Sequence, residues 1–358
     1  MIRGFFLIGL VAMLGCGGER DAEATSSGAT SLGLTTLGGS EASSGDEGTS
    51  IGTSADGGTV FDIGDGGSST GDAGDGDGDG EGCESVDFLF VIDNSGSMGD
   101  NQQNLVDSFP GFIQAIQNTV QEASDYHIMV AKTDAGWGGD CALLCPAFFG
   151  ICPDIPEYPC MTGPPTACDS VMGAGVTYPI GSDSSGQQCS LASGSRFITP
   201  ADANLAQSFE CIARVGTDGS GDERPAEALT AALSTSLNSA GGCNEGFLRD
   251  DAILVVTIIT DEEDSSSPGT PAGWLTNVVA QKAGDGSGVV MIGLINDTDA
   301  EQPQCPSESE DPERLRTFID SFPNSFRGSV CAPDYVDVLQ EAVSIIDTAC
   351  QEYVPPVG

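Results

Sequence analysis

The sequence has few basic residues, with 11 Lys and Arg against 54 Asp and Glu and a formal net charge of -43. Nucleic-acid binding depends on basic side chains that contact phosphates, so this balance argues against a DNA or RNA partner. Histidine occurs once, at His127, and no two cysteines have the Cys-x-x-Cys spacing, which argues against a zinc site. Both classes of function are therefore disfavoured from the outset.

The sequence also lacks an apolar run long enough to cross a membrane. The N-terminal run, residues 5–14, follows Arg3 and leads through small residues to Cys16, a pattern typical of a signal peptide. Because it ends at a cysteine, it resembles the lipobox of bacterial lipoproteins, in which the cysteine becomes the acylated N-terminus. We expect residues 1–16 to be the signal and Cys16 the lipid anchor; the alternative is an ordinary secretory signal cut near Gly15.

Residues 17–82 consist of Gly, Ser, Thr, Asp and Glu with almost no large apolar side chains. A segment of this composition cannot bury a core, and its repelling carboxylates favour extension, so we expect a disordered acidic tether. Its Asp-Gly repeat could bind calcium loosely, but it lacks the period of calcium-binding β-helices. The residue after Cys16 is Gly17 rather than aspartate, which by resemblance to the usual sorting pattern favours the outer membrane.

Beyond Cys83, strand-like and helix-like segments alternate, a pattern typical of a parallel α/β sheet. Apolar runs predict strands at 88–92, 127–132, 196–198, 253–259 and 289–295. Periodicity predicts helices at 105–120, 223–237, 274–282, 312–322 and 336–349. We therefore expect a doubly wound, mostly parallel central sheet flanked by helices across residues 83–350, followed by a tail at 351–358.

Oxygen-bearing side chains follow two of these strands. Asp93, Ser95 and Ser97 alternate after the first strand, and Asp261 follows the strand at 253–259. Ligands of doubly wound sheets bind beyond the carboxyl ends of strands, and uncharged or carboxylate oxygens suit a hard ion such as Mg²⁺. An aspartate after a strand is also a common turn former or helix cap, which would explain Asp261 alone.

The motif DNSGS at 93–97 resembles the metal-ion-dependent adhesion site of von Willebrand factor type A (vWA) domains, and the resemblance covers roughly residues 84–350. It implies that Asp93, Ser95, Ser97 and Asp261 surround a divalent cation, with Mg²⁺ favoured and Mn²⁺ or Ca²⁺ as alternatives. The family also uses a threonine from a second loop, and Thr217 matches it best.

Ser220 is an alternative to Thr217, because the spacing to the following helix is stretched. After Asp261, the acidic residues Glu262, Glu263 and Asp264 replace the family's usual glycine, and they form either an extra calcium site or a solvated loop.

The resemblance implies a binding module. A cation with largely neutral ligands keeps an open position that a carboxylate of a protein ligand can complete, so we expect adhesion or another envelope interaction at the surface of a bacterial cell. One alternative is an envelope scaffold with a structural or vestigial metal site. A metal-dependent hydrolase is less favoured, because His127 lies within a predicted strand and no general base is evident; we therefore expect no enzyme.

Twelve of the 13 cysteines remain after Cys16, an even number that favours disulfides in an exported chain. Half of these lie in a Gly- and Pro-containing segment, 136–193, that we expect to be a crosslinked insertion; its pairings stay unassigned. Three outer pairings are predicted: Cys83 with Cys350 because topology brings the two ends together, Cys305 with Cys331 because they flank one helix, and Cys211 with Cys243 by elimination.

Overall fold

A computed structural model describes residues 83–119, 125–134, 164–307 and 309–354. The predicted signal with Cys16, the tether at 17–82 and residues 136–163 of the insertion lie outside this range. Within the described range, no helix is both long and apolar enough to cross a membrane.

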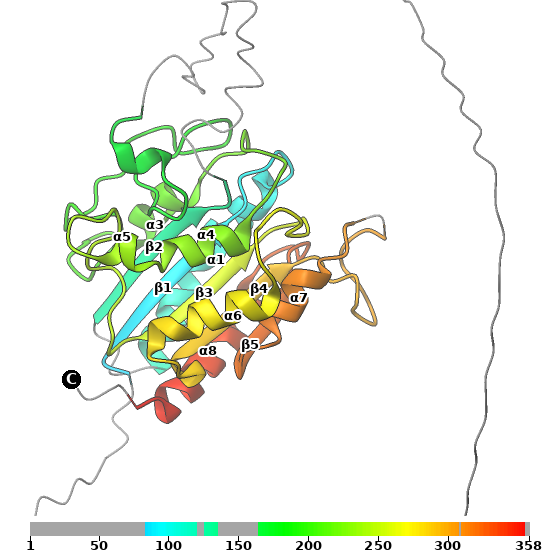
Figure 1. Ribbon diagram of the computed structural model, residues 1–358. Helices are drawn as coiled ribbons and strands as arrows, with labels where there is room; N and C mark the ends of the chain where they lie inside the picture. Colours follow the sequence, from blue (N-terminus) through cyan, green and yellow to red (C-terminus); the bar gives the residue numbers. More distant parts are fainter. Residues whose placement is uncertain (1–82, 120–124, 135–163, 308, 355–358) are drawn as a thin grey trace, which may run out of the picture. The chain divides into compact units, whose positions relative to one another are not determined.

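In the described part of the chain, five strands form one sheet in which every pair is parallel (Figure 1). The strands are β1 (Ser85–Ile92), β2 (Asp125–Lys132), β3 (Ile253–Ile259), β4 (Val289–Ile295) and β5 (Asn324–Ser329). Their order is β2-β1-β3-β4-β5, so the chain moves first to one side of β1 and then to the other. The switch point of this α/β fold therefore lies between β1 and β3.

Helices cover both faces of the sheet. On one side lie α1 (Gly99–Thr119), α3 (Leu205–Ala213) and α8 (Val336–Glu352); on the other lie α4 (Pro225–Ala232), α6 (Pro271–Val279) and α7 (Glu313–Ile319) (Figure 1). Because side chains alternate along a strand, Phe88 and Phe90 enter the core beside α1, whereas Leu89 and Val91 enter the core beside α4. Coverage of both faces explains why β3 is apolar at every position but Thr257 and is buried throughout.

Two strand predictions need correction. Residues 196–198 form no strand of the sheet; Ile198 only makes an isolated antiparallel bridge with Ile128 of β2. The edge strand β5, with the sequence NSFRGS, was not predicted, because it is mostly half-buried and lacks an apolar run. An edge strand has a paired neighbour on one side only, so its sequence is under weaker demand for burial.

Four disulfides lie among the described residues, and two were predicted, Cys83–Cys350 and Cys305–Cys331. The predicted pairing of Cys211 with Cys243 is wrong: the bonds are Cys189–Cys211 and Cys168–Cys243. Elimination failed because it treated the cysteines of the insertion as bonded among themselves. The described end of the insertion instead runs beside the edge of the sheet, where the backbone N–H of Val176 donates to the carbonyl of Val130 at 2.7 Å. Its two described cysteines therefore meet later parts of the chain.

The folded part extends slightly beyond the expected boundary at Cys350. Helix α8 continues to Glu352, and Tyr353 is buried. The ring of Tyr353 packs so closely on Gly288 that a Cβ at this glycine would lie 2.6 Å from the tyrosine Cε2. Any larger residue at position 288 would displace the Tyr353 ring.

Candidate functional site

The first loop of the predicted site follows β1 at the switch point of the sheet. Its backbone is joined to β3, because the N–H of Asp93 donates to the carbonyl of Ile259 at 2.9 Å. The Asp93 carboxylate is fully buried; Oδ1 accepts from the N–H of Ser95 at 2.7 Å, and Oδ2 accepts from the Thr260 hydroxyl at 2.6 Å. These bonds hold Asp93 in one orientation next to the following loop.

The hydroxyls of this loop connect it to Asp261. The Oγ atoms of Ser95 and Ser97 lie 3.2 Å apart, and the Ser97 hydroxyl donates to Oδ1 of Asp261 at 3.0 Å. Ser95 is buried, whereas Ser97 is exposed. The structure thus brings together four sequence-predicted residues, with an opening to solvent at Ser97.

The second loop borders the first. A Cβ on Gly96 would lie 3.8 Å from the carbonyl oxygen of Thr217, and the N–H of Gly219 donates to the carbonyl of Asn94 at 2.8 Å. The hydroxyl of Thr217, however, bonds within its own surroundings, to Oδ2 of Asp183 at 3.1 Å and to the Ser182 carbonyl at 3.3 Å. The structure therefore places Thr217 beside the site with its hydroxyl already engaged.

The alternative second-loop residue, Ser220, is engaged as well. Its backbone N–H donates to Oδ2 of Asp134 at 3.1 Å, and its hydroxyl oxygen accepts from the N–H of Asp222 at 3.1 Å. Neither hydroxyl of the second loop is hydrogen-bonded to Asp93, Ser95, Ser97 or Asp261.

Two supporting residues escaped sequence reasoning. Gln102 of α1, which is 2% exposed, donates from Nε2 to the carbonyls of Asp93 at 3.0 Å and Gly216 at 2.8 Å, and so clamps the first loop to the second. Asp183 of the insertion has a φ of 59° and accepts the Thr217 bond. A single Gln within a helix, or Asp within a loop, carries no signal that could have identified either one.

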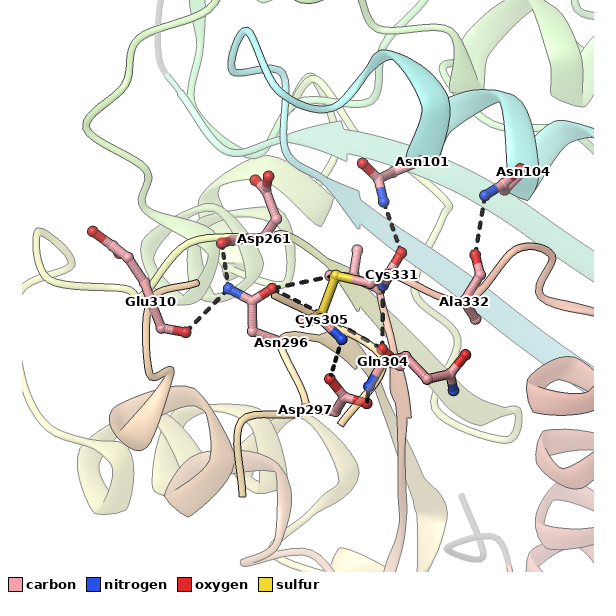
Figure 2. The surroundings of a disulfide bond; sticks show 12 residues. Asn101, Asn104, Asp261, Asn296, Asp297, Gln304, Cys305, Glu310, Cys331 and Ala332 are labelled. Atoms are coloured by element: carbon pink, nitrogen blue, oxygen red, sulfur yellow. Dashed lines mark hydrogen bonds between the residues drawn. A yellow bond between two sulfur atoms is a disulfide. The ribbon is translucent and has the colours of Figure 1, made fainter. Parts of the chain in front are cut away.

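Asn296, after β4, fixes the loop of Asp261 from below (Figure 2). Its Nδ2 donates to the carbonyls of Asp261 at 2.6 Å and Glu310 at 3.1 Å, and its Oδ1 lies 3.3 Å from the Cys305 sulfur. The Cys305–Cys331 disulfide crosslinks this region, and the Asp261 carboxylate extends away from Asn296. The backbone of Asp261 is therefore held while its carboxylate stays available.

The acidic run after Asp261 is mostly structural. The buried Asp264 accepts through Oδ2 from the N–H of Ala226 in the first turn of α4 at 2.8 Å, and Glu263 accepts through Oε2 from the N–H of Arg314 in the first turn of α7 at 2.7 Å. Both carboxylates satisfy N–H groups that a helix leaves open at its start. Of these three acidic residues, Glu262 is the one for which no hydrogen bond to the start of a helix is found among the described residues.

Carboxylates crowd the site. Burial raises the pKa of Asp93 to about 6, despite hydrogen bonds from Thr260 and Ser95, and repulsion from Asp261 adds to the rise. Burial, then repulsion from Asp93 and Asp261, raises the pKa of Glu262 to about 7. A site of this kind gains from any positive charge placed within it.

Glu223 is a further carboxylate that sequence reasoning missed. It is 2% exposed, and burial followed by repulsion from Asp93 raises its pKa to about 10. The pattern had placed Glu223 at the start of a predicted helix at 223–237. The helix begins at Pro225, so Glu223 belongs to the preceding loop; proline's preference for a first helical position was the available signal.

Within the described residues, no group of three or more His, Cys, Asp or Glu side chains is arranged to hold a metal ion. The predicted ligand set differs in kind, because hydroxyls outnumber carboxylates in it.

Comparisons with known proteins add little. No family and no curated protein matches the sequence. Among solved structures, the chain is similar to proximal thread matrix protein 1 from the mussel byssus, with 14% identity and a TM-score of 0.37. This match covers 74% of the present chain and 49% of the mussel chain.

Proposed function

We propose that this protein binds a protein ligand through a divalent cation held beyond β1 and β3. The ion's ligands are Asp93, Ser95, Ser97 and Asp261, with Thr217 as the second-loop member that the family resemblance implies. The observation that carries this proposal is the continuous contact from Ser95 through Ser97 to Asp261, which joins two loops far apart in sequence.

The donor atoms fit a hard cation. All are oxygens, as Mg²⁺, Mn²⁺ and Ca²⁺ prefer, and Mg²⁺ is favoured where few carboxylates contribute. The bonds of Asp93 to Ser95 and Thr260 preorganise one carboxylate, and Asn296 positions the other. Because Ser97 is exposed, a carboxylate of the ligand could approach a bound ion from the solvent side. Such a site binds rather than cleaves, since no general base is assigned to it.

The proposed setting follows from the N-terminal pattern. A lipid on Cys16 would anchor the protein in the outer membrane or at the cell surface. The acidic tether at 17–82 would hold the domain away from that membrane. The disulfides fit an oxidising compartment.

A scaffold with a structural or vestigial metal site is the second candidate. The observation in its favour is that the Thr217 hydroxyl bonds to Asp183 and Ser182 rather than to the first loop. A scaffold would keep its partners when the metal site is lost.

The two candidates are separated by capturing envelope proteins on the immobilised protein with Mg²⁺ or with chelator. We expect capture that depends on Mg²⁺ and is lost in Asp93→Ala. Asp337→Ala, which removes an exposed carboxylate of α8, is the matched control and should capture as wild type does. Capture by Asp93→Ala, and by wild type in chelator, at the level seen for wild type in Mg²⁺ would favour the scaffold.

A further inference from the structure

The Cys305–Cys331 disulfide contacts the side chain that holds the Asp261 loop (Figure 2). The Oδ1 atom of Asn296 lies 3.3 Å from the Cys305 sulfur and 3.9 Å from the Cys331 sulfur. The Nδ2 atom of the same amide donates to the carbonyl of Asp261 at 2.6 Å. Asn296 is 1% exposed, so close packing restricts rotation of its amide. One side chain therefore separates the disulfide from the backbone of a proposed cation ligand.

The disulfide joins two chain segments that lie beside Asn296. One segment is the turn after β4, in which Oδ1 of Asp297 accepts from the N–H of Cys305 at 2.9 Å. The other segment follows β5, where the N–H of Val330, next to Cys331, donates to the carbonyl of the last residue of β4 at 3.0 Å. Without the disulfide, only noncovalent contacts would hold these two segments together around Asn296.

The segment that contains Cys331 also contacts the helix that follows the first loop (Figure 2). The Nδ2 atoms of Asn101 and Asn104, at the start of α1, donate to the carbonyls of the residues directly before and after Cys331, at 2.7 and 3.2 Å. Helix α1 begins shortly after Ser97. The disulfide thus connects the support of Asp261 with the support of Ser97.

We infer that the Cys305–Cys331 disulfide, acting through Asn296, is a positioning element of the cation site. This inference rests on the proposed cation site and specifies what holds its two loops in register. The Ser97 hydroxyl donates to Oδ1 of Asp261 at 3.0 Å, so a shift of either loop would separate two oxygens that the ion must bind together. Partners that orient metal ligands without touching the metal often change its affinity by 10- to 100-fold.

Isothermal titration of the purified protein with Mg²⁺ tests the inference. We expect Cys305→Ser/Cys331→Ser to bind Mg²⁺ at least about 10-fold more weakly than wild type. The matched control is Cys168→Ser/Cys243→Ser. It opens a disulfide with a sequence separation of 75 residues rather than 26, so it should destabilise the fold at least as much. No contact within the described range joins this second disulfide to the site, so the control should bind within a factor of about 3 of wild type.

Asn296→Ala distinguishes positioning from a general loss of stability, because it leaves every disulfide closed. We expect it, too, to weaken Mg²⁺ binding by at least about 10-fold. If the disulfide acts through Asn296, adding Asn296→Ala to Cys305→Ser/Cys331→Ser should weaken binding by less than about 3-fold more, whereas independent effects would multiply.

Each outcome decides the question. Wild-type affinity in Cys305→Ser/Cys331→Ser overturns the inference, and so does an equal loss in the control or a combined variant in which the two losses multiply. In each of these cases, loss of binding in Asp93→Ala would leave the proposed cation site standing. Absence of binding to the wild-type protein overturns both. If Cys305→Ser/Cys331→Ser does not fold, Asn296→Ala decides alone, and wild-type affinity in that variant overturns the inference.

Discussion

Replacing Glu223 with glutamine is expected to flatten the pH dependence of stability in the metal-free protein. The pKa of Glu223 rises from its ordinary value of 4.5 to about 10 on folding, because burial and the Asp93 carboxylate disfavour its ionised form. Between these two values the folded protein retains a proton that the unfolded chain has released. The stabilisation is therefore complete below the unfolded pKa and is lost as pH rises toward the folded pKa.

The size of this effect follows from linkage. One extra proton bound by the folded state gives a loss of about 1.4 kcal/mol in unfolding free energy for each unit of pH. Between about pH 6 and pH 8, Glu223 alone would remove up to about 3 kcal/mol. Asp93 and Glu262, with pKa values raised to about 6 and about 7, add to the loss in the lower part of this range.

Urea denaturation in chelator, repeated across this pH range, measures the slope directly. Wild type should lose stability steadily, whereas Glu223→Gln should lose about 1.4 kcal/mol less for each unit of pH. Glu341→Gln, which removes the charge of an exposed glutamate of α8, is the control and should retain the wild-type slope. The reasoning is refuted if wild type and Glu223→Gln have the same slope, since Glu223 would then ionise alike in the folded and unfolded chains.

Three further predictions concern stability. Cys350→Ser removes the Cys83–Cys350 bond, which spans 267 residues, and should lower the unfolding free energy by about 2–4 kcal/mol in urea titrations; an unchanged midpoint would contradict this. Arg249→Met removes the guanidinium, whose Nε donates to the fully buried Asp87 at 2.8 Å and whose Nη2 lies 2.7 Å from the same carboxylate, and should cost about 3–5 kcal/mol. Adding Asp87→Asn should restore part of that loss, and a double variant weaker than Arg249→Met would count against the ion-pair account. Asn296→Ala removes the two hydrogen bonds that Nδ2 of Asn296 donates to the carbonyls of Asp261 and Glu310. It should lower the unfolding free energy by about 1–3 kcal/mol in thermal denaturation, and an unchanged stability would contradict this.

Much of the sheet was predictable because burial on both faces leaves a clear trace in sequence. Strands β1, β3 and β4 are mostly apolar and are buried along nearly their whole length, as strands covered on both faces require. The edge strand β5 lacks that trace, because its neighbours demand little from its side chains. The segment at 196–198 has strand-like residues, yet it pairs only through Ile198.

The candidate site was predictable only where its residues are contiguous or end a strand. Asp93, Ser95 and Ser97 form a recognisable motif, and Asp261 follows the predicted strand at 253–259. Glu223 has no such local context, since its burial is set by packing between loops that are distant in sequence. The disulfides follow the same logic, because ends that topology brings together can be paired by inspection and partners inside a long insertion cannot.

The central claim is that Asp93 and Asp261 form part of a site for a divalent cation. Calorimetric titration of the purified protein with Mg²⁺, beside Asp93→Ala and Asp337→Ala, tests it most directly. The account predicts saturable binding by wild type and Asp337→Ala, together with a gain of about 3 kcal/mol in unfolding free energy at a cation concentration 100-fold above Kd, and none of this in Asp93→Ala. Binding that is absent from wild type, or unchanged in Asp93→Ala, would contradict it.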